Sequence, residues 1–349
     1  MEKIGLLIIS KNNYELLDVW FKNYDYSNFE ILNIDDGSSI EQNLIGKQKC
    51  FNHDIDFLES DKPGVQNNIK QAINFFEKKK ISWIIYQHHD SYPLTENLYG
   101  KLQKYLNNPL IYQFGVIGFN VFCSTNNDLD YCKKSSSLPL RTTARSPLEL
   151  GDGWYRVRKG SRINYAEVNK PFAVESVMWT VALINSSSFL KHIEIDDNYQ
   201  FFHAWDDIAF QFLNKNIYNI VLPDIHFIHD QQIKEKFSIP KNSSTANIKK
   251  RQYFWGRFDH LSVWEKKWKF KYDVNKKKYF FLKKNFLLIY KIINKFCKLI
   301  YGKDIYELDN LETVARETFK KNENEFKGTL IVDFFNHDPK KGPLKTFEL

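Results

Sequence analysis

The first third of the chain alternates short apolar runs with amphipathic stretches. The runs "IGLLIIS", "FEILNIDDGSS" and "WIIYQHHD" begin like buried strands, and the stretches between them, "YELLDVWFKNY" and "VQNNIKQAINFFEKKK", have helical spacing. Strands that alternate with helices predict a parallel sheet, because a parallel pair needs a crossover connection that is usually a helix. We therefore expect an α/β fold with a mostly parallel central sheet and flanking helices.

Polar side chains follow each of these predicted strands. The three polar segments are Ser10–Asn12, Asp35–Ser39 and His88–Asp90. In open α/β sheets, ligands bind at the carboxyl ends of the strands. We expect the three segments to gather at one edge of the sheet.

Each segment taken alone has a simpler interpretation. "DDGSS" can offer Asp36 to a ribose hydroxyl or a base N–H, but it is also an ordinary turn sequence. His88 and Asp90 lie on one face of their strand and His89 on the other, so the first two can share a ligand. Asp90 suits a divalent cation and imidazole favours Mn²⁺-like ions, although a strand that merely surfaces would carry the same residues.

A second acidic segment follows in the middle of the chain. "VMWTVALINSSSFL" predicts a strand that turns into a helix, and "HAWDDIAFQFLNKNIYNIVLPDIHFIHD" predicts a helix, a stop and a short strand. Asp206 and Asp207 at the helix start are either caps or carboxylates kept ionised for a ligand or for base catalysis. His226 and His229 are three positions apart, so we expect only one of them to face a site on that strand.

The remaining segments differ in composition from the predicted sheet. Residues 123–172 predict an insertion, either a solvated loop or an anion site, within a main domain at 1–235. Its arginines are Arg141, Arg145, Arg156, Arg158 and Arg162. Residues 236–349 form a second, mainly helical region. Within it, residues 249–303 carry 17 basic and three acidic residues, a net +14 in a chain of net +8, which indicates a basic appendage facing an anionic partner.

Part of the C-terminal region predicts a basic amphipathic helix. Its apolar residues recur at steps of three and four, with lysines between them: Leu282, Phe286, Ile289, Ile293, Phe296 and Ile300. Such a helix either packs on the main domain or in a homodimer, or lies on an anionic membrane surface. A further helix is predicted over Leu311–Lys321.

Several classes of protein are not indicated. The four cysteines form no C-x-x-C pair, and P-loop, dinucleotide-binding, serine-hydrolase and zinc motifs are missing from the sequence. The start "MEKIGLLIIS" has no cleavage-site pattern, and the apolar runs fall short of the ~18 residues of a membrane span. No recognition motif accompanies the basic segment. We expect a cytoplasmic protein, at most peripheral at the inner face of the membrane, with no nucleic-acid partner.

Taken in this order, the segments resemble a glycosyltransferase of the GT-A fold, which is Rossmann-like, and specifically the inverting family 2 that builds bacterial surface polysaccharides. The resemblance covers about residues 4–230. Its most specific part is "FFHAWDDIAFQFLNKNIYNIVLPDIHFIHD", which is similar to the family's acidic pair, amphipathic helix and terminal histidine. Residues 123–172 and the C-terminal third lie outside the motifs that carry the resemblance; in family members such regions serve acceptor binding, membrane docking or dimerisation.

The resemblance implies roles for individual residues. Asp207 matches the general base, with Asp206 as its partner in the acidic pair. His88–Asp90 falls where the family has Asp-x-Asp, so Asp90 would hold a divalent metal, Mn²⁺ or Mg²⁺, and His229 would complete that site. The implied nucleotide-sugar site consists of Ser10, Asn12, Asp36, Asn68 and His88. The candidate acceptor contacts are Trp179, Trp205 and Glu175.

The function implied is inverting transfer of a sugar from a nucleotide diphosphate, most simply a UDP-sugar, to a hydroxyl of a lipid-linked or growing surface glycan of capsule, O-antigen or lipooligosaccharide type. His88 replaces an acidic residue of the family pattern, and the bulkier "PGVQNN" replaces a small-residue donor loop. The alternative is a non-catalytic binding or scaffold protein of the same fold that acts through its basic C-terminal surface.

Overall fold

The computed structural model describes most of the chain. It covers residues 2–12, 14–23, 25–89, 91–124, 144–145, 168–177, 180–199, 204–230, 263–264, 266–269, 285–301, 323–337 and 342–349. Several predictions fall outside these residues: Asp90, Trp179, Arg141, Arg156, Arg158, Arg162 and the helix over 311–321.

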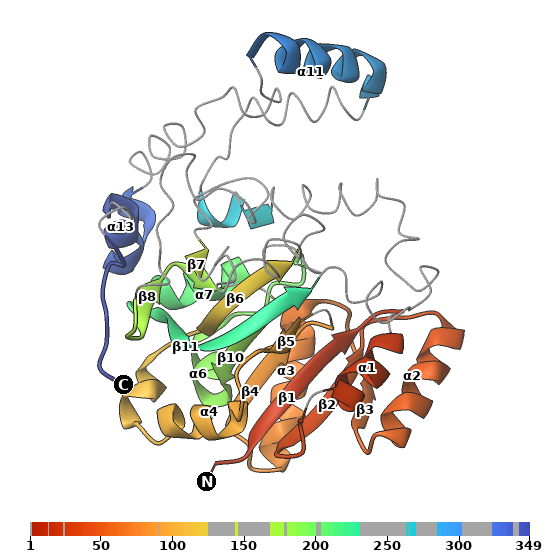
Figure 1. The fold of residues 1–349 in the computed structure, drawn as a ribbon. Coiled ribbons are helices and arrows are strands. Elements are labelled where there is room, and N and C mark those ends of the chain that lie inside the picture. The colour runs from red at the N-terminus through yellow and green to blue at the C-terminus, as the bar shows by residue number, and fades with distance from the viewer. Residues whose placement is uncertain are drawn as a thin grey trace.

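The first third forms one half of a central sheet, as Figure 1 shows in red and orange. Its strands are β1 (Ile4–Ser10), β2 (Phe29–Asp35), β3 (Asp56–Glu59) and β4 (Trp83–Gln87), and its helices are α1 (Glu15–Asn23), α2 (Ile40–Asn52) and α3 (Val65–Lys78). The strands lie in the order β3-β2-β1-β4 and pair in parallel throughout. The predicted alternation of strands and helices is confirmed.

Two elements of this half were not predicted from the sequence, α2 and β3. The apolar residues Ile40, Leu44 and Phe51 of α2 are exposed, so the helix has only a weak apolar stripe to reveal its period. Strand β3 is short and mostly half-buried at the edge of the sheet, and it contains two acidic residues. Tertiary pairing with β2, rather than local pattern, makes this segment a strand.

The second half of the sheet is mixed. Its strands are β10 (Val181–Asn185), β6 (Ile117–Ser124), β11 (Asn219–Asp230), β5 (Ser91–Pro93) and β8 (Phe172–Val174). Strand β10 pairs antiparallel with β4 and β6, β6 and β11 are parallel, and β5 and β8 each pair antiparallel with β11. The strands of one direction are β3, β2, β1, β4, β6 and β11. The predicted α/β class with a mostly parallel sheet is therefore confirmed.

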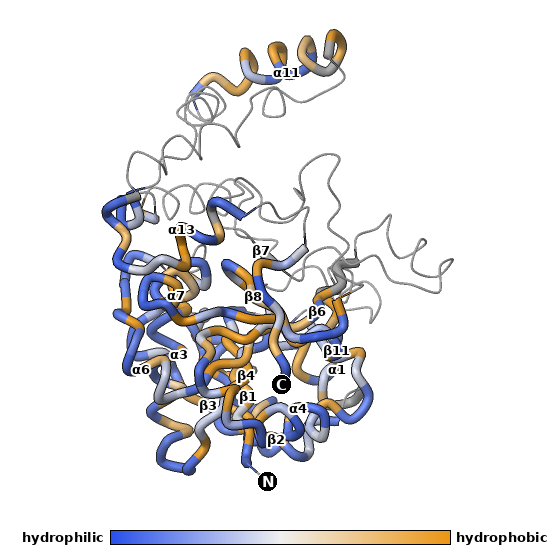
Figure 2. The backbone as a smooth tube through the Cα atoms, turned by 90° about the vertical axis from the view of Figure 1, so that its left-hand side faces the viewer, coloured by the Kyte–Doolittle hydropathy of each residue, from blue (hydrophilic) through white to orange (hydrophobic). Residues whose placement is uncertain are grey.

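Helices cover both faces of this sheet. The helices of the second half are α4 (Leu98–Leu106), the 3₁₀ turn η1 (Pro109–Gln113), α6 (Ser186–His192) and α7 (Ala204–Leu213), and a small ribbon pairs β7 (Ala144–Arg145) with β9 (Ser176–Val177). Alternate residues of β1 enter opposite cores, Leu7 that of α3 and α7, and Leu6 that of α1 and α4. Figure 2 shows this hydrophobic centre along the strands.

The described parts of the C-terminal third return to the sheet, except for one helix. Helix α13 (Thr329–Asn336), which follows the 3₁₀ turn η5 (Glu323–Glu325), contacts α7. Thr346 bridges to Phe172 of β8, and the Phe347 ring lies 4.8 Å from that of Phe114. Helix α11 (Leu287–Tyr301) lies apart from the sheet in both views (Figures 1 and 2). The boundary at 235/236 stays a prediction.

The described helices were compared with the length and hydropathy of a membrane-spanning helix. None of them combines the length and apolar character that crossing a bilayer requires.

Phe76 offers a test of how α3 is seated. Its side chain is fully buried, and a Cβ added to Gly5 of β1 would come within 2.9 Å of its ring, so the ring lies directly on the strand backbone. We expect Phe76→Ala to lower the free energy of unfolding by about 3–5 kcal/mol. The neighbouring Phe75 is only half-buried, and Phe75→Ala should cost about 1–2 kcal/mol. Urea denaturation measures both, and equal losses would contradict this packing.

Candidate functional site

The loops after β1 and β2 are joined to each other at the carboxyl edge of the sheet. The Asp36 N–H donates to the Ser10 carbonyl at 2.8 Å. The Asn12 N–H donates to Ser38 Oγ at 2.8 Å, and Asn12 Oδ1 accepts from the Ser39 N–H at 2.8 Å. Asn12 thus fixes the turn of "DDGSS", and these two predicted segments do gather at one edge.

Asp36 is held in one orientation by α3. Its Oδ1 accepts from the Gly64 N–H at 2.8 Å and from Asn68 Nδ2 at 2.7 Å. Burial raises the pKa of the Asp36 carboxyl, and these two donors oppose that rise. Asn68 is fully buried and its Oδ1 accepts from Ser60 Oγ. No hydrogen bond to Asp36 Oδ2 is seen among the described residues, which leaves this oxygen for a ligand.

A buried polar chain lies beneath this edge. Asn33 Nδ2 donates to Ser10 Oγ at 2.6 Å, and Ser10 Oγ lies 2.8 Å from His89 Nε2. The Trp20 indole N–H donates to the His89 carbonyl at 2.6 Å. The Ser10 hydroxyl and the His89 ring therefore brace the loops from within. The predicted contact of Ser10 with a nucleotide stays a prediction.

The predicted strand ends before its histidines, because β4 stops at Gln87 and His88 and His89 lie in the loop that follows. His89 is buried and His88 half-buried, and the two rings are 6.0 Å apart. The His88 N–H donates to the Thr180 carbonyl at 2.7 Å, which ties the end of β4 to the start of β10. The His88 backbone is thus fixed to β10, and the His89 ring and carbonyl anchor the loop beside it.

The backbone next to the predicted metal ligands pairs across β5 and β11. Asp90 and the side chain of His229 lie outside the described residues. Ser91, the residue after Asp90, pairs with His229 across β5 and β11. The His226 Nε2–H donates to the Pro223 carbonyl at 3.0 Å, so this ring is engaged within β11, at the irregularity between Leu222 and His226. Within the described part of the chain, no three His, Cys, Asp or Glu side chains form a group that could hold a metal.

The Asp207 carboxylate is fully buried at the start of α7. Its Oδ2 accepts from Gln66 Nε2 at 3.0 Å, Gln211 Nε2 at 2.9 Å and Lys267 Nζ at 2.8 Å. Its Oδ1 accepts from the Trp268 indole N–H at 2.8 Å. All four partners can only donate at these atoms, so the arrangement satisfies an ionised carboxylate.

Two opposing influences act on the protonation of Asp207. Burial raises the pKa of its carboxyl above the ordinary value, and the Lys267 ammonium is the largest influence that lowers it. Lys267 also lies 3.5 Å from the Asp196 carboxylate, so the cation serves both groups. The neighbouring Asp206 is buried and accepts from Ser176 Oγ at 3.0 Å. The acidic pair is therefore part of an internal polar cluster.

The first turn of α3 connects the two halves of the site. Asn68 holds Asp36 at the end of β2, and Gln66, two residues earlier, holds Asp207 at the start of α7. Gln66 Oε1 also accepts from the Asp196 N–H at 2.8 Å. Both carboxylates are thus positioned by one rigid helix.

Sequence reasoning missed Gln66, Lys267 and Trp268. The last two belong to a short segment, residues 263–269, that docks on α7. Trp264 and Trp268 are buried, and their rings lie 5.2 and 5.3 Å from that of Phe210. The spacing of Trp264, Lys267 and Trp268 on one helical face was the available signal, hidden within a run of lysines.

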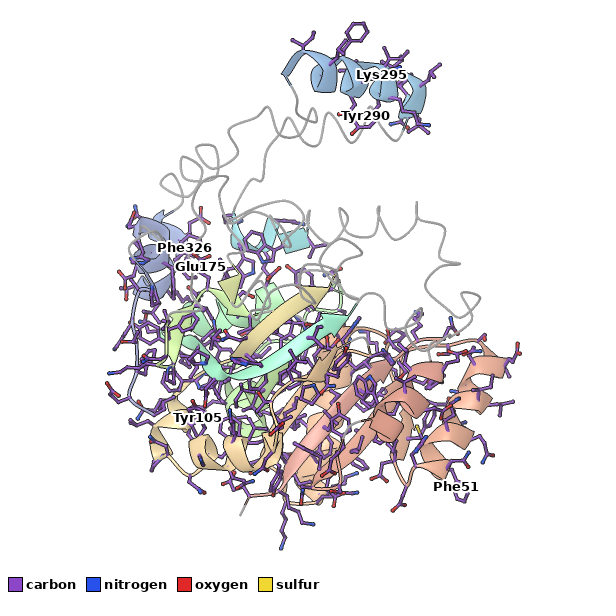
Figure 3. The ribbon with its side chains drawn as sticks, viewed as in Figure 1. Phe51, Tyr105, Glu175, Tyr290, Lys295 and Phe326 are labelled. Carbon is purple, nitrogen blue, oxygen red and sulfur yellow. The ribbon has the colours of Figure 1, made fainter. Side chains whose placement is uncertain are left out.

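Two of the three predicted acceptor residues, Trp205 and Glu175, are described by the structure. Trp205 is buried, and its ring lies 5.1 Å from that of Tyr86 in the core. Glu175 lies between β8 and β9, where its carbonyl accepts from Asn219 Nδ2 at 3.2 Å; Figure 3 labels it. Trp179 lies outside the described residues. Acceptor contact by these residues stays a prediction.

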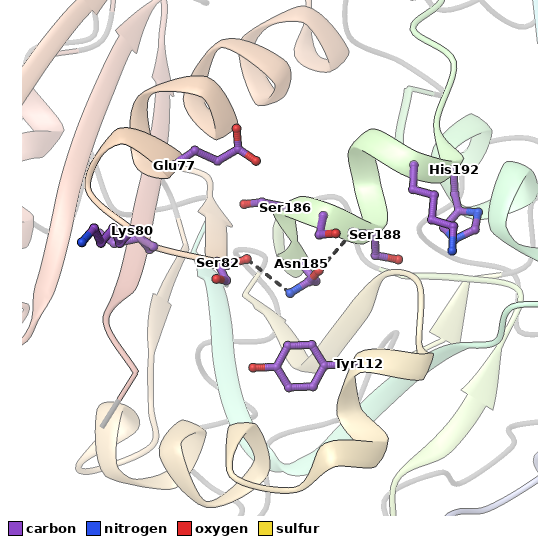
Figure 4. Close-up of a pocket in the computed structure, with 11 residues that line it drawn as sticks. Glu77, Lys80, Ser82, Tyr112, Asn185, Ser186, Ser188 and His192 are labelled. Carbon is purple, nitrogen blue, oxygen red and sulfur yellow. Dashed lines mark hydrogen bonds between the residues drawn. The ribbon is translucent and has the colours of Figure 1, made fainter.

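A cavity of about 550 Å³ lies at the opposite edge of the sheet (Figure 4). Its lining includes Ser82, which precedes β4, and Asn185, which ends the antiparallel β10. The Asn185 side chain accepts from the Ser188 N–H and donates to the Ser82 carbonyl. This cavity is therefore distant from the carboxyl edge that carries Asp36 and is not part of the candidate site.

Comparison with known proteins gives loose structural likenesses. No protein-family model and no curated protein match the chain. The structure is similar to that of "GalNAc-T7 with UDP, GalNAc and Mn²⁺", with 14% identity, a TM-score of 0.47, and coverage of 66% of this chain and 44% of the other.

Two further structures show a similar likeness. The "Mannosyltransferase PcManGT from Pyrobaculum calidifontis in complex with GDP-Man and Mn²⁺" is 10% identical, with a TM-score of 0.43 and coverage of 93% and 87%. TarS from S. aureus is 13% identical, with a TM-score of 0.39 and coverage of 68% and 38%. At these values the likenesses carry no argument about activity or substrate.

Lys267 provides a test of the buried cluster. We expect Lys267→Met to lower the free energy of unfolding by about 1–3 kcal/mol, because it leaves the buried Asp207 carboxylate without its ammonium partner while keeping the apolar stem. The exposed neighbour provides the control, and Lys266→Met should change stability by less than about 0.5 kcal/mol. Equal stability of the two variants in urea denaturation would contradict the compensating role of Lys267.

Proposed function

We propose that this protein is a glycosyltransferase that moves a sugar from a nucleotide diphosphate to a hydroxyl, with inversion. The observation that carries the proposal is the first turn of α3, which positions the carboxylates of Asp36 and Asp207 through Asn68 and Gln66. One carboxylate stands at the end of a parallel strand, where a nucleotide binds, and the other at a helix start, where a base can act.

Asp36 would recognise the nucleotide. Its Oδ1 is fixed by two N–H donors, so Oδ2 has a defined direction in which to accept a ribose hydroxyl or a base N–H. Asn12 keeps the turn around Asp36 in place. His88, half-buried on the neighbouring loop, would lie against the ribose. A UDP-sugar is the simplest donor for this arrangement.

A divalent cation, Mn²⁺ or Mg²⁺, would neutralise the charge that develops on the leaving diphosphate. Asp90 and His229 would hold it through carboxylate oxygen and imidazole nitrogen. The support from the fold is that Ser91, next to Asp90, pairs with His229. The role of His88 is to orient the donor, since it stands where the resembled family carries an acidic side chain.

Asp207 would take the proton of the attacking hydroxyl. A single base with in-line attack gives inversion, and burial raises the pKa of the Asp207 carboxyl toward the range in which a carboxylate accepts a proton well. In the described conformation Lys267 and Trp268 donate hydrogen bonds to this carboxylate. Residues 263–269 would therefore have to move away from Asp207 when an acceptor binds. Asp206 would stabilise the helix start.

The acceptor is proposed from the resemblance alone. A lipid-linked or growing surface glycan, of capsule, O-antigen or lipooligosaccharide type, would approach from the side of α7. Trp179, Trp205 and Glu175 are the residues proposed to contact it. Trp205 would have to leave its contact with Tyr86 to do so.

A second candidate function is a binding or scaffold protein without catalysis. The observation that favours it is the complete coverage of Asp207, whose oxygens are satisfied by four internal donors. A carboxylate that serves only to dock residues 263–269 would have these contacts. The two candidates differ in whether donor sugars are consumed.

Release of nucleotide diphosphate from a panel of activated sugars, with Mn²⁺, separates the candidates. We expect turnover by the wild type and a loss of about 10²–10⁴-fold in kcat for Asp207→Asn, with nucleotide affinity retained. Asp36→Ala should weaken nucleotide binding by about tenfold in calorimetry. Glu77→Gln, at the opposite cavity, is the matched control and should change neither. Nucleotide binding without turnover of any donor would favour the non-catalytic protein, and neither binding nor turnover would refute the transferase.

Metal dependence is tested at the end of β4. We expect Asp90→Ala to abolish metal-dependent turnover, because it removes the proposed oxygen ligand, and His88→Asp to preserve it, because it restores an acidic side chain at a position next to the donor. Activity titrated with Mn²⁺ and Mg²⁺ measures both effects. Full metal-dependent turnover by Asp90→Ala would show that the cation is held elsewhere.

A further inference from the structure

Helix α11 exposes a large apolar surface. Six of its residues, here called the apolar face, are between 48% and 81% exposed: Leu288, Ile289, Ile292, Phe296, Leu299 and Ile300. Large apolar side chains are normally buried in a core. A contiguous exposed group of them indicates an interaction surface. Figure 2 shows hydrophobic and hydrophilic residues alternating around this helix.

The orientation of α11 leaves the apolar face turned outward. Tyr290 is buried, at 6% exposure, and in Figure 3 it lies on the side of the helix toward the rest of the chain. Leu299 follows it by nine positions, so at about 100° per residue the two lie on opposite sides of the helix. The most exposed residue of the face, Leu299 at 81%, is thus on the side of the helix opposite the buried Tyr290.

Lysines border the apolar face along one edge. Lys291 and Lys295 are exposed and one turn apart, and Lys298 continues the same stripe in the sequence. Leu288 and Leu299 lie immediately beside this stripe at helical spacing. The side chains therefore form an apolar surface with a cationic margin, which is the pattern of a helix that lies in a lipid interface.

The positive charge of this region favours an anionic bilayer over a second copy of the chain as the partner of the apolar face. Residues 249–303 carry a net charge of +14, so a second copy of this chain would bring two strongly basic segments together. An anionic bilayer instead attracts every lysine near its surface and takes up the apolar side chains below the headgroups. The helix is also too short to span a bilayer: its 15 residues extend about 22 Å, against a hydrocarbon core of about 30 Å.

We propose that α11 docks this protein on an anionic lipid bilayer, lying in the plane of the interface with its apolar face in the acyl region and Lys291 and Lys295 at the headgroups. This inference does not depend on the proposed transferase activity. Docking through α11 would hold the whole chain, including the candidate site at the carboxyl edge of the sheet, at the membrane surface.

The test is flotation of the full chain with vesicles. We expect binding to vesicles of phosphatidylcholine with phosphatidylglycerol at low salt, and on the order of tenfold weaker binding to phosphatidylcholine alone or at high salt. No binding to the anionic vesicles at low salt would overturn the proposal.

Two pairs of variants locate the surface. Leu288→Asp with Leu299→Asp should reduce the partition onto anionic vesicles by on the order of tenfold or more, since two charges enter the apolar face. The matched control changes two exposed apolar residues of α2, Ile40→Asp with Phe51→Asp, and should bind as the wild type does. Likewise, Lys291→Glu with Lys295→Glu should remove the preference for anionic lipid, whereas Lys78→Glu with Lys104→Glu should retain it.

A measurement of oligomeric state distinguishes vesicle binding from dimerisation through the apolar face. Light scattering without vesicles should show the same mass for wild type and for Leu288→Asp with Leu299→Asp. A dimer that this variant dissociates, without any vesicle binding by the wild type, would assign the apolar face to a second copy of the chain. Vesicle binding that neither α11 variant reduces would place the lipid contact elsewhere and overturn the proposal.

Discussion

The buried carboxylate of Asp207 has lost its hydration, and hydrogen-bond donors in fixed positions must replace that hydration. The arrangement of the rest of the site depends on this requirement. Its partners come from α3, from α7 and from residues 263–269, so one charge ties three segments that are far apart in the sequence. Because an uncompensated buried charge is costly, these contacts stabilise the described arrangement of the three segments. The packing of Trp264 and Trp268 on Phe210 excludes water around the same group.

Around Asp36, the loops of the proposed nucleotide site are held by hydrogen bonds between neutral groups and by the two donors to the Asp36 carboxylate. Asn12 and the turn after β2 exchange hydrogen bonds, and Asn68 aligns Asp36 through its side-chain amide. Asn12 and Asp36 are half-buried, whereas Asn68 is buried beneath them. The contrast between an accessible Asp36 and a covered Asp207 suits an enzyme that binds its donor first and uncovers its base later. It suits equally a binding protein whose acidic pair is structural, which is why turnover rather than affinity distinguishes the two functions.

Much of the fold could be predicted from the sequence because its strands are buried on both faces and its longer helices have one apolar stripe. The parallel order at the start of the chain and the gathering of Asn12 and Asp36 at one edge follow from this pattern. Helix α2 and strand β3 could not be predicted, since α2 exposes its apolar residues and β3 exists through pairing with β2. The antiparallel insertion of β10 between β4 and β6 likewise depends on contacts that no local pattern encodes.

The sequence by itself indicated which residues can carry chemistry, the carboxylates Asp36 and Asp207 at element boundaries, and that the α11 segment is amphipathic and basic. It did not indicate the exposed face, because the predicted stripe included the half-buried Ile293 and omitted Leu288 and Leu299. Only the tertiary structure decided how the carboxylates are used. Gln66 and Asn68 point to different carboxylates because α3 crosses between β2 and α7, and Lys267 meets Asp207 across 60 residues of chain. The physical reason is that sequence periodicity specifies which side of an element is buried, whereas the partner of a buried charge is chosen by the packing of distant elements.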